Sequence, residues 1–494
     1  MKPQHLILAG IFLLSVIVRT MAAASSEYFT SDTSYSALRQ IEHIAETGRP
    51  LINDSLSYGG RIHILMPAYY YLLSATTLVF PGILAMKLVA NLLASTIIIA
   101  TYLLAYKLSK NNNVALACAF LSSIIPLYIA ETINDIDAIA IVLPGSIFIL
   151  YLFLSLEDNN RVLFTLVPLS LIVILTSASS LIVLFCLLAF IVICYLENIP
   201  IKRVQKEFIF FFFFFFFWSI FLIYKYAFQI LGFSLIWQNT PSAIMDTYFK
   251  NIDLAQSASS IGPLLLLFGL STIFTYLFRK KSKNAYAMIS LFFISISMFW
   301  LRLVNAELGI VFIAESTILL FAIFIMDLYE YIIKTKLERH SVLILIGIFL
   351  LAVGWPLSAS AQSVLDSLAD APTEKEISAF VWIKNTLPED AVIMSPATSG
   401  NLITYFSSRK NIIDRDFLMV TDVDRRYEDV TKFYNVKIKV EAISILEKYG
   451  SEYVIATNER EKEIVDSNIC MIKLFESSVN VYQLNTSLCS LKRI

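Results

Sequence analysis

Acidic residues stand at two places where a mostly apolar chain turns polar. Asp32 lies in the polar stretch 25–67, which directly follows the first hydrophobic run of the chain. Asp135 and Asp137 form an Asp-x-Asp pair in the turn IPLYIAETINDIDAIAIVLP, between two further apolar runs. Carboxylates at a membrane boundary are costly unless they are solvated, paired or bound to a metal ion. Both places are therefore candidate functional sites.

The Asp-x-Asp spacing has two interpretations. In a tight turn, the two carboxylates can offer oxygen ligands to one divalent cation such as Mg²⁺ or Mn²⁺. The same pair can instead cap the next helix, where negative charge meets the positive end of the helix dipole. A lone Asp-x-Asp is more often such a cap, and Asp32 on the same side of the membrane favours the metal site. We predict Asp32 as the reactive carboxylate and, in a metal-dependent reaction, as a ligand beside Asp135 and Asp137.

A third candidate group is Arg302 in the segment FWLRLVNAELG. Its guanidinium can bind a phosphate through a bidentate fork; the alternative is an arginine that reaches up to the membrane interface. Glu307 is a further metal-ligand candidate or an interfacial charge, and the second interpretation is the simpler one. The remaining candidates in the acidic turn and the opening polar stretch are Glu131, Tyr35 and His63.

The composition indicates a polytopic membrane protein. Hydrophobic residues make up 57% of the 494 residues and charged residues 16%, whereas a soluble domain has about 45–50% and about 25%. A net charge of -1 provides no basic field for nucleic acid. A span needs about 20 apolar residues. We expect about eleven transmembrane helices, near 5–24, 84–106, 114–130, 137–156, 162–177, 179–196, 207–225, 261–278, 285–300, 309–332 and 341–360.

The distribution of basic residues predicts the orientation of the chain. All four clusters fall on one side of the membrane if residues 64–82 lie in the interface without crossing it. If 64–82 is an ordinary span, every later loop is inverted. The positive-inside rule favours the first arrangement, with a cytoplasmic N-terminus and an extracytoplasmic C-terminus in the cytoplasmic membrane. The clusters are Lys107 and Lys110; Lys202, Arg203 and Lys206; Arg279, Lys280, Lys281 and Lys283; and Lys334, Lys336 and Arg339.

The composition changes after about residue 360, which divides the chain into a transmembrane domain, 1–360, with a first outer loop over 25–83, and a C-terminal domain, 361–494. Helical patterns there alternate with short apolar strands, which predicts a small extracytoplasmic α/β domain. Helices are expected over 374–387, 401–408 and 439–450, and strands over 391–395, 411–414 and 452–457. Cys470 and Cys489 can pair if this domain faces an oxidising compartment.

Taken in order, these features resemble the GT-C superfamily of polyprenyl-phosphate-dependent glycosyltransferases. That superfamily includes the catalytic subunit of oligosaccharyltransferase and the protein O-mannosyltransferases that use dolichyl-phosphate-mannose. The resemblance rests on Asp32 in SDTSY, the stretch PAYYYLL, the pair in NDIDA and the phrase FVWIKNTLPEDAVIMS. It implies a donor sugar on a polyprenyl phosphate, with the phosphate at Arg302 and, in metal-dependent members, at a divalent metal. It also implies that Asp32 acts on an acceptor hydroxyl with inversion at the anomeric carbon.

The chain departs from the asparagine-glycosylating members of this superfamily. Those enzymes carry a WWDYG motif that binds the acceptor, and the corresponding stretch here reads SPATSGNLITYF. A glutamate motif of the T-I-x-E kind is also not evident. The acceptor, whether protein, glycan or lipid, is therefore open. A non-catalytic relative that binds a lipid-linked glycan or scaffolds an envelope complex is the alternative, and a transporter is disfavoured because we find no inverted repeat with broken spans.

Overall fold

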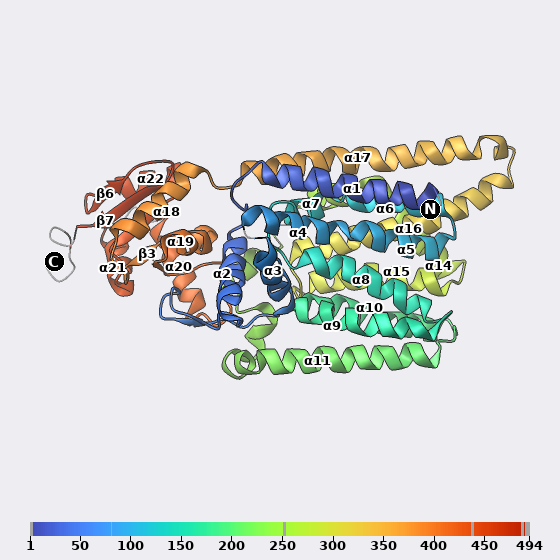
Figure 1. The fold of residues 1–494 in the computed structure, drawn as a ribbon, viewed down its shortest axis with the longest axis horizontal. Helices are drawn as coiled ribbons and strands as arrows, with labels where there is room; N and C mark the ends of the chain where they lie inside the picture. The colour runs from blue at the N-terminus through green and yellow to red at the C-terminus, as the bar shows by residue number, and fades with distance from the viewer. Residues whose placement is uncertain (1–2, 81, 250–252, 436–438, 486–488, 490–494) are drawn as a thin grey trace. The chain divides into compact units, whose positions relative to one another are not determined.

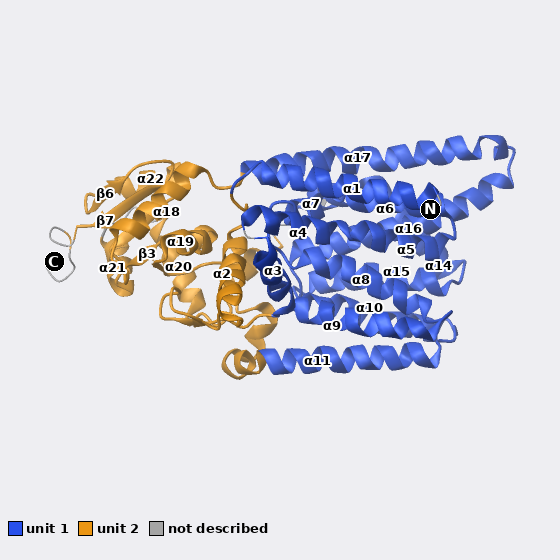
Figure 2. Cartoon of the chain, in the orientation of Figure 1, with its two compact units in different colours: residues 1–27, 66–223, 252–369 blue, residues 28–65, 224–251, 370–494 orange. Residues whose placement is uncertain are grey.

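The computed structural model describes residues 3–80, 82–249, 253–435, 439–485 and 489 (Figure 1). Two compact units are distinguished in Figure 2. The polar stretch after the first helix is divided between them, and residues 28–65 group with the C-terminal part of the chain. Unit 1 comprises Met1–Glu27, Met66–Ile223 and Ile252–Ala369, and unit 2 comprises Tyr28–Leu65, Tyr224–Asn251 and Asp370–Ile494.

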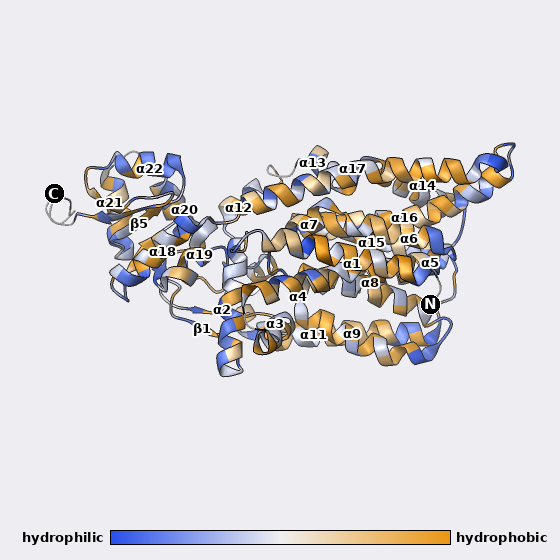
Figure 3. Cartoon of the chain, turned by 45° about the horizontal axis from the view of Figure 1, so that its top comes forward, coloured by the Kyte–Doolittle hydropathy of each residue, from blue (hydrophilic) through white to orange (hydrophobic). Residues whose placement is uncertain are grey.

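Unit 1 is built from apolar helices (Figure 3). Helices occupy all eleven stretches in which we expected transmembrane segments, and the stretch 64–82 contains the short helix α3, Ala68–Val79. The others are α1, Pro3–Ala24; α4, Ile83–Ser95; α5, Ile97–Ser109; α6, Asn112–Ser123; α7, Pro126–Thr132; α8, Ile139–Ser155; α9, Leu163–Thr176; α10, Leu181–Leu196; α11, Arg203–Leu231; α13, Leu254–Ile261; α14, Pro263–Phe278; α15, Lys283–Trp300; α16, Ala306–Ile333; and α17, Ser341–Ala369.

Six helical segments in the described part of the chain are long and apolar enough to cross a membrane. The number rises to eight if each of two bent pairs counts as one span: α6 with α7, which bend by 51°, and α13 with α14, which bend by 82°. Pro126 and Pro263 begin the second helix of each pair, as expected for a residue that cannot continue a helix but is well suited to start one. The total of eleven spans stays a prediction.

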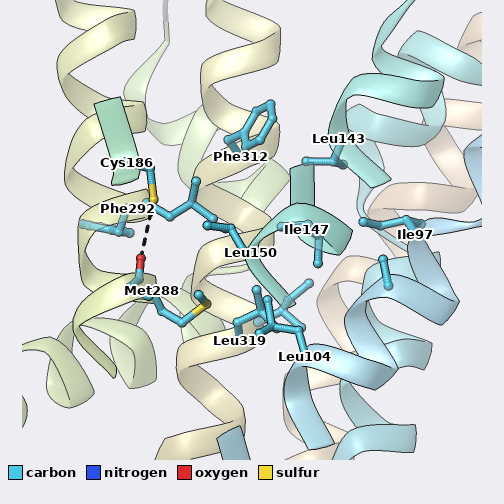
Figure 4. Packing of buried hydrophobic residues seen from close by; sticks show 14 of the residues in the cluster. Ile97, Leu104, Leu143, Ile147, Leu150, Cys186, Met288, Phe292, Phe312 and Leu319 are labelled. Atoms are coloured by element: carbon cyan, nitrogen blue, oxygen red, sulfur yellow. Dashed lines mark hydrogen bonds between the residues drawn. The ribbon is translucent and has the colours of Figure 1, made fainter. Parts of the chain in front are cut away.

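The core of unit 1 is a continuous cluster of buried aliphatic and aromatic side chains from α5, α8, α10, α15 and α16 (Figure 4). Small residues let these helices approach closely, as is typical of membrane proteins. A Cβ atom at Gly269 of α14 would overlap a methyl carbon of Thr317 on α16, and one at Gly145 of α8 would overlap a methyl carbon of Val173 on α9. Helix contacts of this kind fix the ends of the helices, where the polar candidates stand.

Basic loops meet at one end of the unit 1 helices. Lys283 pairs with Glu157 and also donates to Gln205 Oε1 at 2.8 Å, so the starts of α11 and α15 lie against the loop after α8. Because the helices run from one end of unit 1 to the other, the turn before α8 and the turn between α15 and α16 lie at the opposite end. Further ion pairs of the basic end join Lys107 to Asp158, Lys280 to Asp327 and Lys281 to Glu197.

Unit 2 contains a five-stranded mixed sheet in the order β4-β3-β5-β7-β6. Ile393 and Ile455 pack on one face with α18 and α19. Met394 and Val454 point to the other face, where α20, α21 and α22 contribute to the cluster. The strands are β3, Val392–Met394; β4, Lys410–Asn411; β5, Tyr453–Ala456; β6, Met471–Phe475; and β7, Asn480–Leu484, and the helices are α18, Glu374–Thr386; α19, Gly400–Ser407; α20, Val423–Phe433; α21, Lys439–Tyr449; and α22, Glu459–Asp466.

The first polar stretch is part of this unit. It forms helix α2, Asp32–Thr47, and a two-stranded ribbon of β1, Asn53–Asp54, and β2, Arg61–Ile62. Backbone hydrogen bonds from Tyr58 N to Asn411 O, 3.0 Å, and from Asn411 N to Leu56 O, 3.1 Å, join it to the edge strand β4. Cys470 and Cys489 form a disulfide in the same unit. The expected helices and the strands expected over 391–395 and 452–457 agree with the structure within one residue, whereas the strand expected over 411–414 is only Lys410–Asn411.

Candidate functional site

Asp135 and Asp137 stand in the turn between α7 and α8 of unit 1. Asp137 Oδ1 accepts a hydrogen bond from Ile139 N at 2.7 Å, so this carboxylate does cap the start of α8. Burial raises the pKa of Asp137, the Ile139 hydrogen bond opposes that rise, and the negative charge of Glu307 adds to it. Asp135 is buried. The charge of Glu307, in the first turn of α16, therefore acts on Asp137 of this turn.

Buried cationic side chains lie beside this turn. Lys87 of α4 donates to the carbonyl oxygens of Ala23, 2.9 Å, and Ser26, 2.8 Å, at the end of α1. The Ala23 carbonyl belongs to the last turn of α1, at the negative end of the helix dipole, where an ammonium group is favoured. The ammonium group also lies within electrostatic reach of Asp135. Lys87 therefore places one positive charge next to the Asp-x-Asp pair.

Arg19 of α1 connects three helices at the same end of unit 1. Its Nε donates to Asn91 Oδ1 of α4 at 3.1 Å, and its Nη2 donates to Thr132 of α7. Asn91 in turn donates to Ile133 O at 2.9 Å, at the start of the acidic turn. A buried guanidinium is tolerated only when its donors are satisfied, and here they fix the position of the turn that carries Asp135.

The other unit 1 candidates lie at the same end. Arg302 is half-buried in the turn between α15 and α16, with a positive φ of 58° and its backbone N donating to Phe299 O at 3.0 Å. Glu307 is exposed in the first turn of α16. Glu131 is half-buried in the last turn of α7. The left-handed backbone at Arg302 is uncommon for a residue with a side chain and marks this position as one held by its surroundings.

Asp32 is the first residue of α2 and belongs to unit 2. Its two carboxylate oxygens accept hydrogen bonds from the start of α19: Oδ1 from Leu402 N at 2.9 Å, and Oδ2 from Asn401 Nδ2 at 3.0 Å. The side chain is 7% exposed. Burial raises the pKa of Asp32 to about 8; the hydrogen bond from Leu402 opposes the rise, and the charges of Asp414 and Asp416 add to it. Asp32 therefore holds a proton near neutral pH and joins the first polar stretch to α19.

A second polar cluster lies close to Asp32 in unit 2. Arg61 Nη1 donates to Asp414 Oδ1 and to Asp416 O, each at 2.6 Å, and its Nη2 donates to Asp54 at 3.2 Å. Asp54 also accepts from both terminal nitrogens of Arg39, at 2.5 and 3.1 Å. These ion pairs hold β1 and β2 against the segment that follows β4.

Two other candidates of the opening stretch have partners in this unit. His63 Nε2 lies 3.2 Å from Asp54 Oδ2. Tyr35 is buried, donates to Phe29 O at 2.8 Å and packs against Tyr405 with ring centroids 5.7 Å apart. These contacts are structural, and any role for either residue in catalysis stays a prediction.

Among the described residues, no group of three or more His, Cys, Asp or Glu side chains is arranged to hold a metal ion. Asp135 and Asp137 offer carboxylate oxygens but not a complete set within unit 1. No step proposed below therefore depends on a metal ion.

Several of these polar residues were missed by the sequence analysis. Arg19, Lys87 and Glu315 stand inside apolar helices, and Glu315 of α16 is fully buried with Oε1 accepting from Thr101 at 2.5 Å. A charged residue inside a hydrophobic run indicates a buried polar contact. The sequence shows such a residue at all three positions. The pairing of Arg61 with Asp414 had no such local signal, because the two residues are 353 positions apart.

Comparison with known proteins shows that this chain resembles several solved structures. No family model matches the sequence, and no curated protein matches it. The oligosaccharyltransferase AglB of Archaeoglobus fulgidus, in complex with an inhibitory peptide and a dolichol-phosphate, matches 97% of this chain and 75% of its own, with a TM-score of 0.68 and 14% identity. ArnT from Cupriavidus metallidurans, bound to undecaprenyl phosphate, matches 98% of this chain and 99% of its own, with a TM-score of 0.52 and 11% identity.

AglB and ArnT are both GT-C glycosyltransferases. The chain therefore has the GT-C fold over nearly its whole length, and the resemblance inferred from Asp32, the Asp-x-Asp pair and the C-terminal phrase is confirmed at the level of the fold. Another structure of the Archaeoglobus enzyme, a complex with Zn and sulfate, matches 98% of this chain with a TM-score of 0.65 and 16% identity. At such identities the comparisons establish fold and leave activity to be argued from the residues.

Proposed function

We propose that the protein is a membrane glycosyltransferase that moves a sugar or oligosaccharide from a polyprenyl phosphate, such as dolichyl phosphate, to an acceptor on the outer face of the cytoplasmic membrane. The observation that carries this proposal is the fold, shared with AglB and ArnT over 97–98% of the chain. Those two structures are complexes with dolichol-phosphate and with undecaprenyl phosphate. The acidic turn and Arg302 at one end of unit 1, opposite the basic loops, support an extracytoplasmic site.

In this proposal the acceptor oxygen attacks the anomeric carbon of the donor sugar. The bond from that carbon to the phosphate oxygen breaks with inversion, and polyprenyl phosphate leaves with the bonding electron pair. Asp32 orients the acceptor or, in its ionised form, takes the acceptor proton. Its raised pKa of about 8 makes that ionised form a stronger base than an ordinary carboxylate, and the ionised fraction grows as the pH rises toward 8. Arg302 binds the phosphate through its guanidinium. If the reaction is metal-dependent, Asp135 and Asp137 would offer carboxylate oxygens to Mg²⁺ or Mn²⁺, which would neutralise charge on the leaving phosphate.

A second function is favoured by one observation in unit 2. Both oxygens of Asp32 already accept hydrogen bonds from α19, and the stretch before α19 reads SPATSG where asparagine-glycosylating relatives carry WWDYG. A non-catalytic relative that binds a lipid-linked glycan, or scaffolds an envelope complex, would tolerate an Asp32 whose oxygens are already hydrogen-bonded.

If the protein is an enzyme, its acceptor is a protein, a glycan or a lipid.

The deciding experiment measures sugar transfer by the purified full-length protein. A polyprenyl-phosphate sugar is offered with candidate acceptors, and wild type is compared with Asp32→Asn and Asp137→Asn. We expect each substitution to lower kcat at least a hundredfold, about 2.7 kcal/mol of transition-state stabilisation. Asp246→Asn, at an exposed position of the outer loop, is the matched control. Turnover that survives both substitutions contradicts the assignment, and donor binding without transfer to any acceptor favours the non-catalytic relative.

A further inference from the structure

The phenol of Tyr69 is buried next to the acidic turn and is not used by the mechanism above. Tyr69 is the second residue of α3 and is 1% exposed. Its hydroxyl has no hydrogen-bond partner among the residues that the structure describes. Buried polar groups in native proteins nearly always have a partner, so an exception calls for an explanation.

The charges of the Asp-x-Asp pair act on this hydroxyl. Burial raises the pKa of Tyr69 well above its ordinary value, and the negative charges of Asp137 and Asp135 raise it further, as do Tyr70 and Tyr128. The hydroxyl is therefore protonated and within electrostatic reach of both carboxylates. A protonated phenol is a hydrogen-bond donor, and the structure gives this donor no acceptor in the described part of unit 1.

The charges around the turn restrict which ligand can supply the acceptor. Lys87 lies within reach of Asp135, and Glu307 within reach of Asp137. A sugar hydroxyl both donates and accepts, so the carboxylates of the turn could hold it without the phenol. An ionised phosphate brings only acceptor oxygens and needs donors. A neutral O–H adds such a donor without further charge in a crowded polar site.

We propose that Tyr69 donates a hydrogen bond to a phosphate oxygen of the polyprenyl phosphate and thereby positions the lipid-linked donor beside Asp135 and Asp137. This inference rests on the donor class of the proposed function and adds to it a positioning residue on α3. Tyr69 acts here on the leaving group, whose orientation decides whether the anomeric carbon is open to attack.

The test is Tyr69→Phe, which removes one oxygen atom and leaves the ring in place. A hydroxyl that has no protein partner can be removed without loss of folding stability, so the melting temperature of the full-length protein should stay equal or rise. Affinity for polyprenyl phosphate in lipid nanodiscs should fall about tenfold, the effect of one hydrogen bond to a charged group. Tyr71→Phe, on the same helix with a side chain that is 42% exposed, is the matched control and should change neither quantity.

Two further ligands identify the contact. Polyprenol lacks the phosphate and should bind wild type and Tyr69→Phe equally, whereas inorganic phosphate, used as a competitor, should lose affinity for the variant. Unchanged affinity of Tyr69→Phe for polyprenyl phosphate overturns the inference. A lower melting temperature with unchanged binding also overturns it, because the hydroxyl would then be structural. A loss of affinity that is seen only for the sugar-loaded donor, and not for polyprenyl phosphate itself, overturns it as well. If wild type itself binds no polyprenyl phosphate, the donor class of the proposed function fails instead, whatever Tyr69 does.

Discussion

Asp54 is held as an anion by basic side chains on three sides. Burial alone would raise its pKa, but hydrogen bonds from His63 and Arg39, with the charges of Arg39 and Arg61, hold the pKa of Asp54 well below its usual range. A carboxyl with a depressed pKa stabilises the folded state at every pH above its unfolded value of about 3.9, and that stabilisation is lost as the pH falls below this value. Unit 2 should therefore be sensitive to acid through this residue.

We expect Asp54→Asn to lower the stability of unit 2 by about 3 kcal/mol at pH 7, because Arg61 is then left buried with one partner fewer. The difference from wild type should shrink as the pH falls below about 4. Thermal unfolding of the full-length protein, measured from pH 7 down to pH 3, checks both statements. A difference that stays constant over this range would show that the charge of Asp54 has no part in it.

Asp32 combines a proposed catalytic role with a visible structural one, and two substitutions separate them. Asn at position 32 resembles the protonated carboxyl, because its amide oxygen can accept the hydrogen bond from Leu402 N. The amide oxygen of Asn401 has no hydrogen-bond partner among the described residues. If the Asn401 amide is turned over, that oxygen can accept a hydrogen bond from the new amide NH₂ group. Asp32→Asn should keep the melting temperature near that of wild type, and Asp32→Ala should cost about 1–3 kcal/mol. Equal losses in the two variants would mean that the hydrogen bonds to α19 contribute little.

At the scale of elements, Gly400 fixes how α19 begins. A Cβ atom there would lie 2.6 Å from the backbone oxygen of Ile413 and 2.8 Å from Cβ of Asp414. Neither atom belongs to the end of a flexible side chain, so the helix start would have to shift, and Asn401 and Leu402 would move away from Asp32. We expect Gly400→Ala to lower the free energy of unfolding by about 1–3 kcal/mol and to impair sugar transfer as well. Gly354→Ala on α17, where nothing lies within 4 Å, is the control for thermal unfolding and should be neutral.

The local elements of this chain were predictable, because hydrophobic periodicity and capping residues act over a few positions. The pattern around KVEAISILEKYG predicts α21, and Gly450, with φ of 60°, ends it as expected. The hydrophobic pattern does not indicate which residues far apart in the sequence contact one another. Nothing in the sequence near Asp32 indicates that α19 supplies its hydrogen bonds, from residues 369 and 370 positions later. The expected contributions of Asp135, Asp137 and Arg302 rested on helix order alone, and that order does bring them to one end of unit 1.

At the scale of the whole molecule, charge and cysteine chemistry predict its orientation. The basic loops meet at one end of unit 1, and the Cys470–Cys489 disulfide in unit 2 is typical of an oxidising compartment. The three other cysteines are free but buried in apolar helices, so none of the native cysteines should react with a membrane-impermeant maleimide. The native protein therefore provides an unreactive background for single reporter cysteines.

We expect Glu459→Cys, at the exposed start of α22, to react fully in intact cells. Lys336→Cys, in the exposed loop between α16 and α17, should react only after the membrane is permeabilised, because the positive-inside rule places that loop in the cytoplasm. The reverse pattern would invert every loop, put residues 64–82 across the membrane and move Asp135, Asp137 and Arg302 to the cytoplasmic side. A donor phosphate presented at the outer face could then not reach Tyr69, so this labelling experiment tests the proposed site together with the orientation.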